Sequence, residues 1–117
     1  MILAILDDLM FSSKIKTAAT GLGVPVTFVR SSAAALAEMR RSAPSLVILD
    51  LNNPRADPLG AVRSMKDDPA LAAIPTVGFV SHVQTDLIEA ARQAGVTQVM
   101  ARSAFTDQLP ELLATFK

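Results

Sequence analysis

The sequence predicts an α/β fold in which helices cover both faces of a parallel five-stranded sheet of order 2-1-3-4-5. Five short apolar runs alternate with segments of helical spacing, which favours successive β-α units. The runs lack a strict apolar-polar alternation, as is typical of strands buried on both faces. The 117 residues, half of them hydrophobic, fit a single domain spanning 1–117 with a proper core. Right-handed crossovers leave few topologies, and this strand order is the natural five-strand solution.

The first two β-α units occupy the N-terminal third of the chain. ILAIL (2–6) is the first expected strand, and apolar residues at helical spacing follow over 15–22. VTFV (26–29) is the second strand. A hydroxyl pair beginning at Ser31 is then a cap signal for a helix that carries apolar residues over 35–39.

The middle of the chain supplies the third unit and the fourth strand. LVILDL (46–51) is expected as a strand, followed by a loop that Pro54 and Pro58 should stiffen. The connector over 59–66 is short and weakly patterned, and TVGFV (76–80) is the fourth strand. The third helix is therefore the one that the sequence defines least.

The C-terminal part completes the alternation. Helical spacing over 87–94 ends at Gly95, which is typical of a left-handed helix terminus. QVM (98–100) is the fifth strand. The last helix is expected to begin near Asp107, because Pro110 is tolerated only in a first turn.

Composition excludes several classes of function. Eleven basic residues balance eleven acidic ones, which argues against a broad electrostatic grip on nucleic acid or anionic membrane. The five Phe are the only aromatic residues, so base-stacking platforms are not expected. No apolar run approaches the roughly 18 residues of a membrane span. Cysteine is absent, so disulfide and thiolate chemistry are excluded, and a cytoplasmic location is expected.

Polar side chains follow four of the five predicted strands where each strand ends. These are Asp7 and Asp8, then Asp50, then Ser81 with His82, and finally Arg102 with Ser103. Carboxyl ends of parallel strands meet at one edge of the sheet, so we expect these residues to converge there. Three carboxylates in one place repel one another, and a hard divalent cation such as Mg²⁺ would relieve that repulsion. A hydroxyl and a guanidinium opposite them would suit a phosphoryl group.

In these features the chain resembles, over its whole length, the receiver domain of two-component response regulators, related to the chemotaxis receiver. The resemblance rests on ILAILDD, on LVILDL with Pro54 four residues after Asp50, on the hydroxyl residue of FVS, and on AGVTQVMARSAF. The last segment stands where the family has Gly-Ala…Lys-Pro-Phe. The joint order and spacing of these motifs is specific, although each alone is common. The family has the flavodoxin-like doubly wound fold.

The resemblance implies a metal-assisted phosphoacceptor. Asp50 is the expected acceptor, whose carboxylate attacks a phosphohistidine or a small phosphodonor. Asp7 and Asp8 would hold Mg²⁺ together with Asp50 and the backbone carbonyl of Asn52. The metal and a nearby cation would neutralise charge on the transferring phosphoryl group.

Two further residues complete the implied site, each with an alternative. Ser81 would donate its hydroxyl to the phosphoryl group, or it would cap the next helix, since SHVQ fits a capping box. Arg102 stands at the family's lysine, where it would anchor the phosphoryl group or clamp Asp50 with two parallel hydrogen bonds. His82 is expected to be a loop residue without a catalytic role.

Several residues depart from the family's pattern. Ser103 replaces the usual cis-proline, so a cis peptide is not expected there. Val99 occupies the place of the switch aromatic, which removes the usual hydroxyl–aromatic coupling. Phe105, rather than Ala104, takes the place of the family's Phe, and Phe11 is expected over the site.

The main functional prediction is a phosphoacceptor receiver of a two-component phosphorelay, and not an enzyme beyond self-phosphorylation and autodephosphorylation. Its partners would be a sensor histidine kinase or phosphotransfer protein and a downstream protein, without nucleic acid or membrane. The downstream partner would dock on the face of the fourth helix, fifth strand and fifth helix, and a second copy of the chain is a further candidate. The chain would act alone or as the receiver part of a longer protein.

Two other functions are weighed against this one. A degenerate receiver would act as a phosphorylation-independent interaction module, as the residues at 99, 102 and 103 suggest. A flavin-binding flavodoxin would share the architecture. That function is disfavoured, because Asp7 and Asp8 would repel a flavin phosphate and no Trp or Tyr could stack on the flavin ring.

Overall fold

The computed structural model describes residues 1–81 and 84–117 and contains a five-stranded parallel sheet of order β2-β1-β3-β4-β5. The strands are β1 (Ile2–Ile5), β2 (Val26–Val29), β3 (Leu46–Asp50), β4 (Thr76–Val80) and β5 (Gln98–Ala101). The helices are α1 (Leu9–Leu22), α2 (Ser32–Ser42), the short 3-10 helix η1 (Pro54–Ala56), α3 (Pro58–Asp67), α4 (Thr85–Ala94) and α5 (Arg102–Phe116). The predicted fold class and strand order are confirmed.

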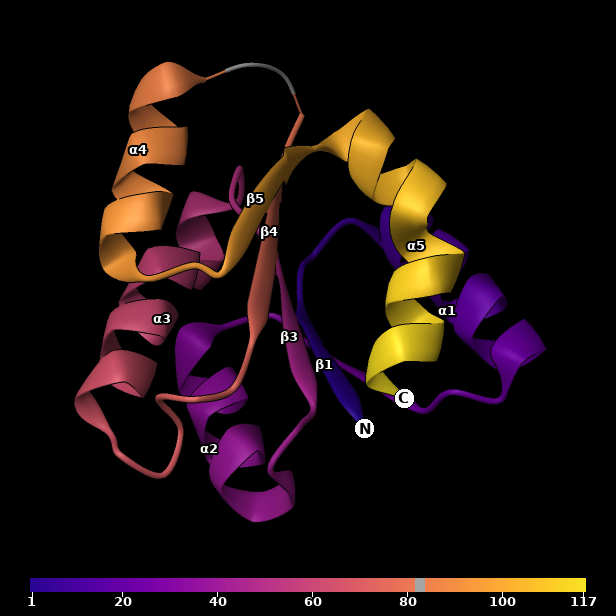
Figure 1. Cartoon of the computed structure of the whole chain (residues 1–117), viewed down its shortest axis with the longest axis horizontal. Coiled ribbons are helices and arrows are strands. Elements are labelled where there is room, and N and C mark those ends of the chain that lie inside the picture. The colour runs from indigo at the N-terminus through magenta and orange to yellow at the C-terminus, as the bar shows by residue number, and fades with distance from the viewer. Residues whose placement is uncertain (82–83) are drawn as a thin grey trace.

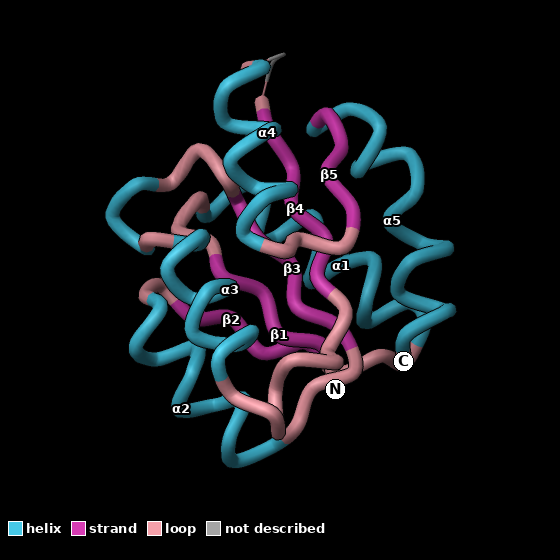
Figure 2. The backbone as a smooth tube through the Cα atoms, turned by 60° about the vertical axis from the view of Figure 1, so that its left-hand side comes forward, coloured by secondary structure: helices cyan, strands magenta, loops and turns pink. Residues whose placement is uncertain are grey.

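The helices form two layers around the sheet. α1 and α5 cover one face, and α2, α3 and α4 cover the other (Figure 1, Figure 2). Each layer has its own apolar core, because successive residues of a strand point to opposite faces. In β1, for example, Ile2 and Ala4 pack toward α1 and α5, whereas Leu3 and Ile5 pack toward α2 and α3.

Burial separates the central strands from the edge strands. β1 and β4 are buried throughout, and β3 is buried up to Asp50. The edge strand β2 is only half-buried, and in β5 Met100 alone is buried. The acid at the end of β3 is therefore the point where a buried strand leaves the core.

Local signals account for several of the helix boundaries. Ser31 caps α2 by accepting a hydrogen bond from the amide of Ala34, and Gly95 ends α4 in the left-handed conformation, with φ of 107°. Asp8 caps α1 through the amide of Phe11. The caps at Ser31 and Gly95 match the sequence prediction.

The predicted start of the last helix is wrong. α5 begins at Arg102, and Pro110 lies inside it rather than in its first turn. The proline removes one backbone hydrogen bond, but Phe105, Leu109 and Leu113 bury the same face on both sides of it. Burial of that face outweighs the local cost.

Two further observations concern the chain as described. No peptide bond is cis within 1–81 and 84–117, in agreement with the serine at position 103. None of the helices described is long and apolar enough to cross a membrane.

Candidate functional site

The predicted site lies at the carboxyl edge of the sheet, on β1, β3 and β4. Ile5 in β1 pairs with Leu49 in β3, so Asp7 and Asp8 leave the sheet beside Asp50. Asp50 pairs in turn with Phe79 of β4, two residues before Ser81. The topology thus brings these segments to one edge, as the sequence predicts.

Asp50 is a half-buried carboxylate with charged neighbours. Burial raises its pKa first of all, and the charge of Asp8 raises it further. A hydrogen bond of 3.0 Å from the amide of Asn52 and the charge of Arg102 act in the opposite direction. The balance favours the protonated form more than at an exposed aspartate, with the charges of Asp8 and Arg102 acting in opposite directions.

Arg102 forms its ion pair with Asp8. Its Nη2 donates to Oδ2 of Asp8 at 2.8 Å, while Oδ1 of Asp8 accepts from the amide of Phe11 at 3.0 Å. These two bonds, the amide first, hold the pKa of Asp8 below its usual range. The side chains remain 35% and 37% exposed, so water screens the pair in part. The predicted direct clamp of Arg102 on Asp50 is therefore wrong, because the guanidinium binds the neighbouring acid.

A cluster of aromatic rings packs against the guanidinium of Arg102. Cζ of Arg102 lies 4.2 Å from the ring centroid of Phe11, within the range of a cation–π contact. The ring of Phe11 lies 4.9 Å from that of Phe79, which stacks on Phe105 at 4.8 Å. Phe11 thus lies at the site, as predicted, and Phe105 rather than Ala104 is fully buried.

Asp7 faces a different residue. Its Oδ1 lies 3.4 Å from Nε of Arg30, and both side chains are largely exposed. Sequence reasoning missed Arg30, although the signal was available: Arg30 directly follows β2, as Asp7 and Asp8 follow β1 and Asp50 ends β3. The edge of the sheet therefore carries two acid–arginine pairs beside Asp50.

The two acid–arginine pairs determine whether the predicted ligands are available to a divalent cation. Carboxylate oxygens suit a hard ion, but both oxygens of Asp8 are engaged and Asp7 is paired with Arg30. Among the described residues, no three acidic or histidine side chains come together as a metal-binding group. In this arrangement the residues do not fit the ion.

Ser81 contacts Asn52 across the site. Its amide and its hydroxyl donate to Oδ1 of Asn52 at 2.6 and 3.1 Å, and Nδ2 of Asn52 donates to Oε1 of Gln84. The N-cap of α4 is Gln84, so the interpretation of Ser81 as its cap is wrong. The family resemblance implies a role for the backbone carbonyl of Asn52, but nothing in the sequence pointed to this side-chain bridge. His82 lies outside the described residues.

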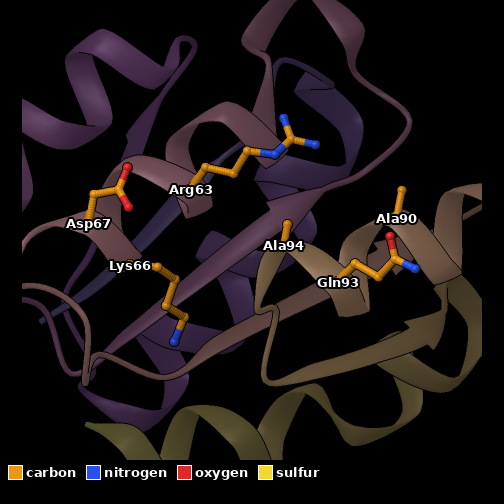
Figure 3. Close-up of a pocket in the computed structure, with 6 residues that line it drawn as sticks. All are labelled: Arg63, Lys66, Asp67, Ala90, Gln93 and Ala94. Carbon is orange, nitrogen blue, oxygen red and sulfur yellow. The ribbon is translucent and has the colours of Figure 1, made fainter.

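Two cavities differ in their relation to this edge. One of about 520 Å³ lies between α1 and α5 and is lined by Asp8, Phe11, Ser81 and Arg102 among others. Another of about 470 Å³ lies between the C-terminal halves of α3 and α4 (Figure 3). Arg63, Lys66 and Asp67 line the second cavity, and none of the predicted site residues does. Only the first cavity belongs to the site.

Comparison of the structure with solved structures finds response regulators. The chain is 28% identical to the phosphorylated cyanobacterial phytochrome response regulator RcpA, with 97% of this chain and 88% of that chain covered and a TM-score of 0.79. A response regulator from Hahella chejuensis is 20% identical, with coverage of 98% and 92% and a TM-score of 0.87. The chain has the response regulator receiver fold. No protein-family model matches the sequence, and no curated protein matches it significantly.

A metal-bound receiver is also among the similar structures. The receiver domain of a sensor histidine kinase from Pseudomonas aeruginosa, with magnesium coordinated in its active site cleft, is 21% identical. The alignment covers 98% of this chain and 94% of that receiver domain, with a TM-score of 0.84. At this identity the likeness establishes the receiver fold alone.

Proposed function

We propose that residues 1–117 form a receiver module of a two-component signalling system and that Asp50 accepts the phosphoryl group. The observation that carries this proposal is the position of Asp50, a half-buried carboxylate at the carboxyl edge with Asp8 and Arg102 close enough to act on its pKa. The receiver fold of the chain supports it.

The reaction would be a direct transfer. A carboxylate oxygen of Asp50 attacks phosphorus, an oxygen–phosphorus bond forms, and the phosphorus–nitrogen bond of a phosphohistidine breaks. The imidazole leaves and takes up a proton. The guanidinium of Arg102 offers positive charge next to the acceptor, which favours the build-up of negative charge on the phosphoryl oxygens. Ser81, at the end of the neighbouring strand, would donate its hydroxyl to one of them.

Mg²⁺ is the cation that the resemblance implies, with Asp7, Asp8, Asp50 and the carbonyl of Asn52 as its proposed ligands. The contacts described above would have to change first, because Asp8 is bonded to Arg102 and Asp7 to Arg30. No step of the transfer is assigned to the ion here.

The proposed partners follow from the receiver role. A sensor histidine kinase or phosphotransfer protein would supply the phosphoryl group. A downstream protein would bind the face built from α4, β5 and α5, where Gln93 and Gln108 are exposed. A second copy of the chain is an alternative occupant of that face, and a cytoplasmic location is part of the proposal.

A second function is favoured by two observations. The ion pair of Asp8 with Arg102, and the lack of a metal-binding acid group among the described residues, would suit a receiver that works without phosphorylation. Such a pseudo-receiver would bind its partners through the same face. Replacement of Asp50 by Asn in the host cell separates the two, since loss of signalling in that variant counts against the pseudo-receiver.

The proposal is tested with small phosphodonors. Acetyl phosphate with Mg²⁺ should add one phosphoryl group, seen by intact-protein mass spectrometry, and beryllofluoride should give a bound ¹⁹F signal. The Asp50→Asn variant is the control and should show neither. If the wild-type chain stays unmodified under conditions that modify an established receiver, the phosphoacceptor function is refuted.

A further inference from the structure

We infer that Arg102 is the resident cation of this site and that a divalent metal must displace it from Asp8. The inference deepens the proposed function, because it concerns how the same site is regulated. It predicts that the chain binds metal weakly while Arg102 is in place, and that Phe11 acts as the positioning residue that holds Arg102 there.

Both carboxylate oxygens of Asp8 already accept a hydrogen bond. Its two oxygens are engaged by the guanidinium of Arg102 at 2.8 Å and by the amide of Phe11 at 3.0 Å. The amide bond belongs to the cap of α1 and comes with the helix. The guanidinium bond is the one that a metal ion can replace. Metal binding and the Arg102 contact therefore compete for one oxygen.

The guanidinium of Arg102 makes a second contact, with the ring of Phe11. The guanidinium lies 4.2 Å from the ring of Phe11, whose own side chain is only 5% exposed. A buried ring cannot follow the arginine outward, so it holds the guanidinium over α1 and next to Asp8. A planar guanidinium can stack on the ring and bond the carboxylate at the same time, whereas a lysine ammonium is a compact point charge. The arginine is thus held by two contacts.

Charge balance supports the same conclusion. The edge carries Asp7, Asp8 and Asp50, and two arginines lie against the first two of these acids. Of these three acids, only Asp50 lacks an ion pair within the described residues. The repulsion that a metal would otherwise relieve is already largely neutralised, which leaves less to gain from binding one.

The test is a titration of the full chain with Mn²⁺ and with Mg²⁺, followed by isothermal titration calorimetry. Arg102→Gln should bind either ion about tenfold more tightly than wild type, the factor expected for loss of a partly exposed ion pair with its cation–π contact. Arg102→Lys should lie between the two. In the wild type, the ¹⁵N–¹H signal of the Arg102 Nε should shift as metal is added, because the guanidinium leaves Asp8.

Lys14→Gln is a matched control, because it removes one positive charge and leaves the contact of Arg102 with Asp8 in place. Lys14 lines the same cavity as Arg102 but is not among the residues that hold the carboxylate of Asp8, which are Phe11 and Arg102, so Lys14→Gln measures the general effect of losing one positive charge. Phe11→Leu keeps every charge and should still tighten metal binding several-fold. Phe11→Leu alters the core. If it does not fold, the comparison of the single variants Arg102→Gln and Lys14→Gln decides the question.

Three results would overturn the inference. Equal affinities in wild type and Arg102→Gln would show that the arginine does not compete. An equal gain in Lys14→Gln would reduce the effect to general charge, and absence of metal binding in every variant would show that something other than Arg102 limits it. None of these affinities depends on modification of Asp50, so failure here and failure of the phosphoacceptor function are separate outcomes.

Discussion

The side chain of Asn52 joins two loops that carry the site, and its removal gives the sharpest test of the structure. Asn52 follows β3, and through its side-chain amide it contacts Ser81 and Gln84, the first and last residues of the β4–α4 connection. We predict that Asn52→Ala loosens this connection while the rest of the sheet stays intact.

The expected loss of stability follows from the bonds. Asn52 accepts two hydrogen bonds from Ser81, at 2.6 and 3.1 Å, and donates one to Gln84. Each such bond contributes about 0.5–1.5 kcal/mol net. Ser81 is exposed, so in the variant water replaces part of the hydrogen bonding that its amide and hydroxyl lose. The free energy of unfolding should therefore fall by about 1–2 kcal/mol.

The neighbouring asparagine provides a matched control. Within 1–81 and 84–117, Nδ2 of Asn53 is buried without a hydrogen-bond partner, so Asn53→Ala removes a group that already costs stability. That variant should be neutral or slightly more stable than wild type. The two substitutions are the same chemical change at adjacent positions of one loop.

Urea unfolding measures the global effect, and amide hydrogen exchange measures the local one. In Asn52→Ala the amide of Ser81 should exchange faster, because its acceptor is gone, while amides in β1 should change only with global stability. If Asn52→Ala and Asn53→Ala unfold alike and the exchange of Ser81 is unaltered, the bridge does not hold the loops together.

Three further predictions concern charge and packing. Because the pKa of Asp50 is raised in the folded state, its ionisation destabilises the fold. Stability therefore falls as pH rises from about the unfolded-state pKa of 3.8 through the folded-state pKa, and Asp50→Asn should unfold at a higher temperature than wild type at pH 7. The lowered pKa of Asp8 works the other way: its contribution is present above 3.8 and is lost as pH falls through the folded value. Asp8→Asn should therefore lose less stability than wild type in urea titrations from about pH 5 to about pH 2. A Cβ at Gly78 would lie 2.8 Å from Leu51, so Gly78→Ala should cost about 1–3 kcal/mol in thermal unfolding, whereas Gly21→Ala, with open space around it, should not destabilise.

The fold could be predicted because its signals are local and repeated. Each central strand is a run of apolar residues, and caps such as Ser31 and Gly95 mark the ends of helices. Alternation and chirality then leave one natural topology. The start of α5 could not be predicted in this way, because the proline rule is local and burial of Phe105 and Leu109 is a tertiary effect.

The site was predictable in its position but not in its pairing. The strand-end rule brings Asp8, Asp50 and Arg102 to one edge, as found. Which acid the arginine binds depends on helix α1, whose first turn presents Asp8 and Phe11 together. Neither the spacing of the residues nor the family resemblance contains that information. Arg30 directly follows β2, so the same strand-end rule also places it at this edge.

The departures from the receiver pattern point to one consequence for how the site communicates with the helices. Val99 in β5 has no ring, so a coupling that depends on an aromatic side chain there is absent. The rings that do adjoin the site are Phe11, Phe79 and Phe105, which lie in the core between the sheet and the layer of α1 and α5. Arg102 lies on the first of these rings and begins the helix that carries the last. We therefore expect a displacement of the guanidinium to disturb the packed rings of the α1–α5 layer more than the α4 side of the sheet, which side-chain NMR signals of Phe11 and Phe105 in Arg102→Gln would report.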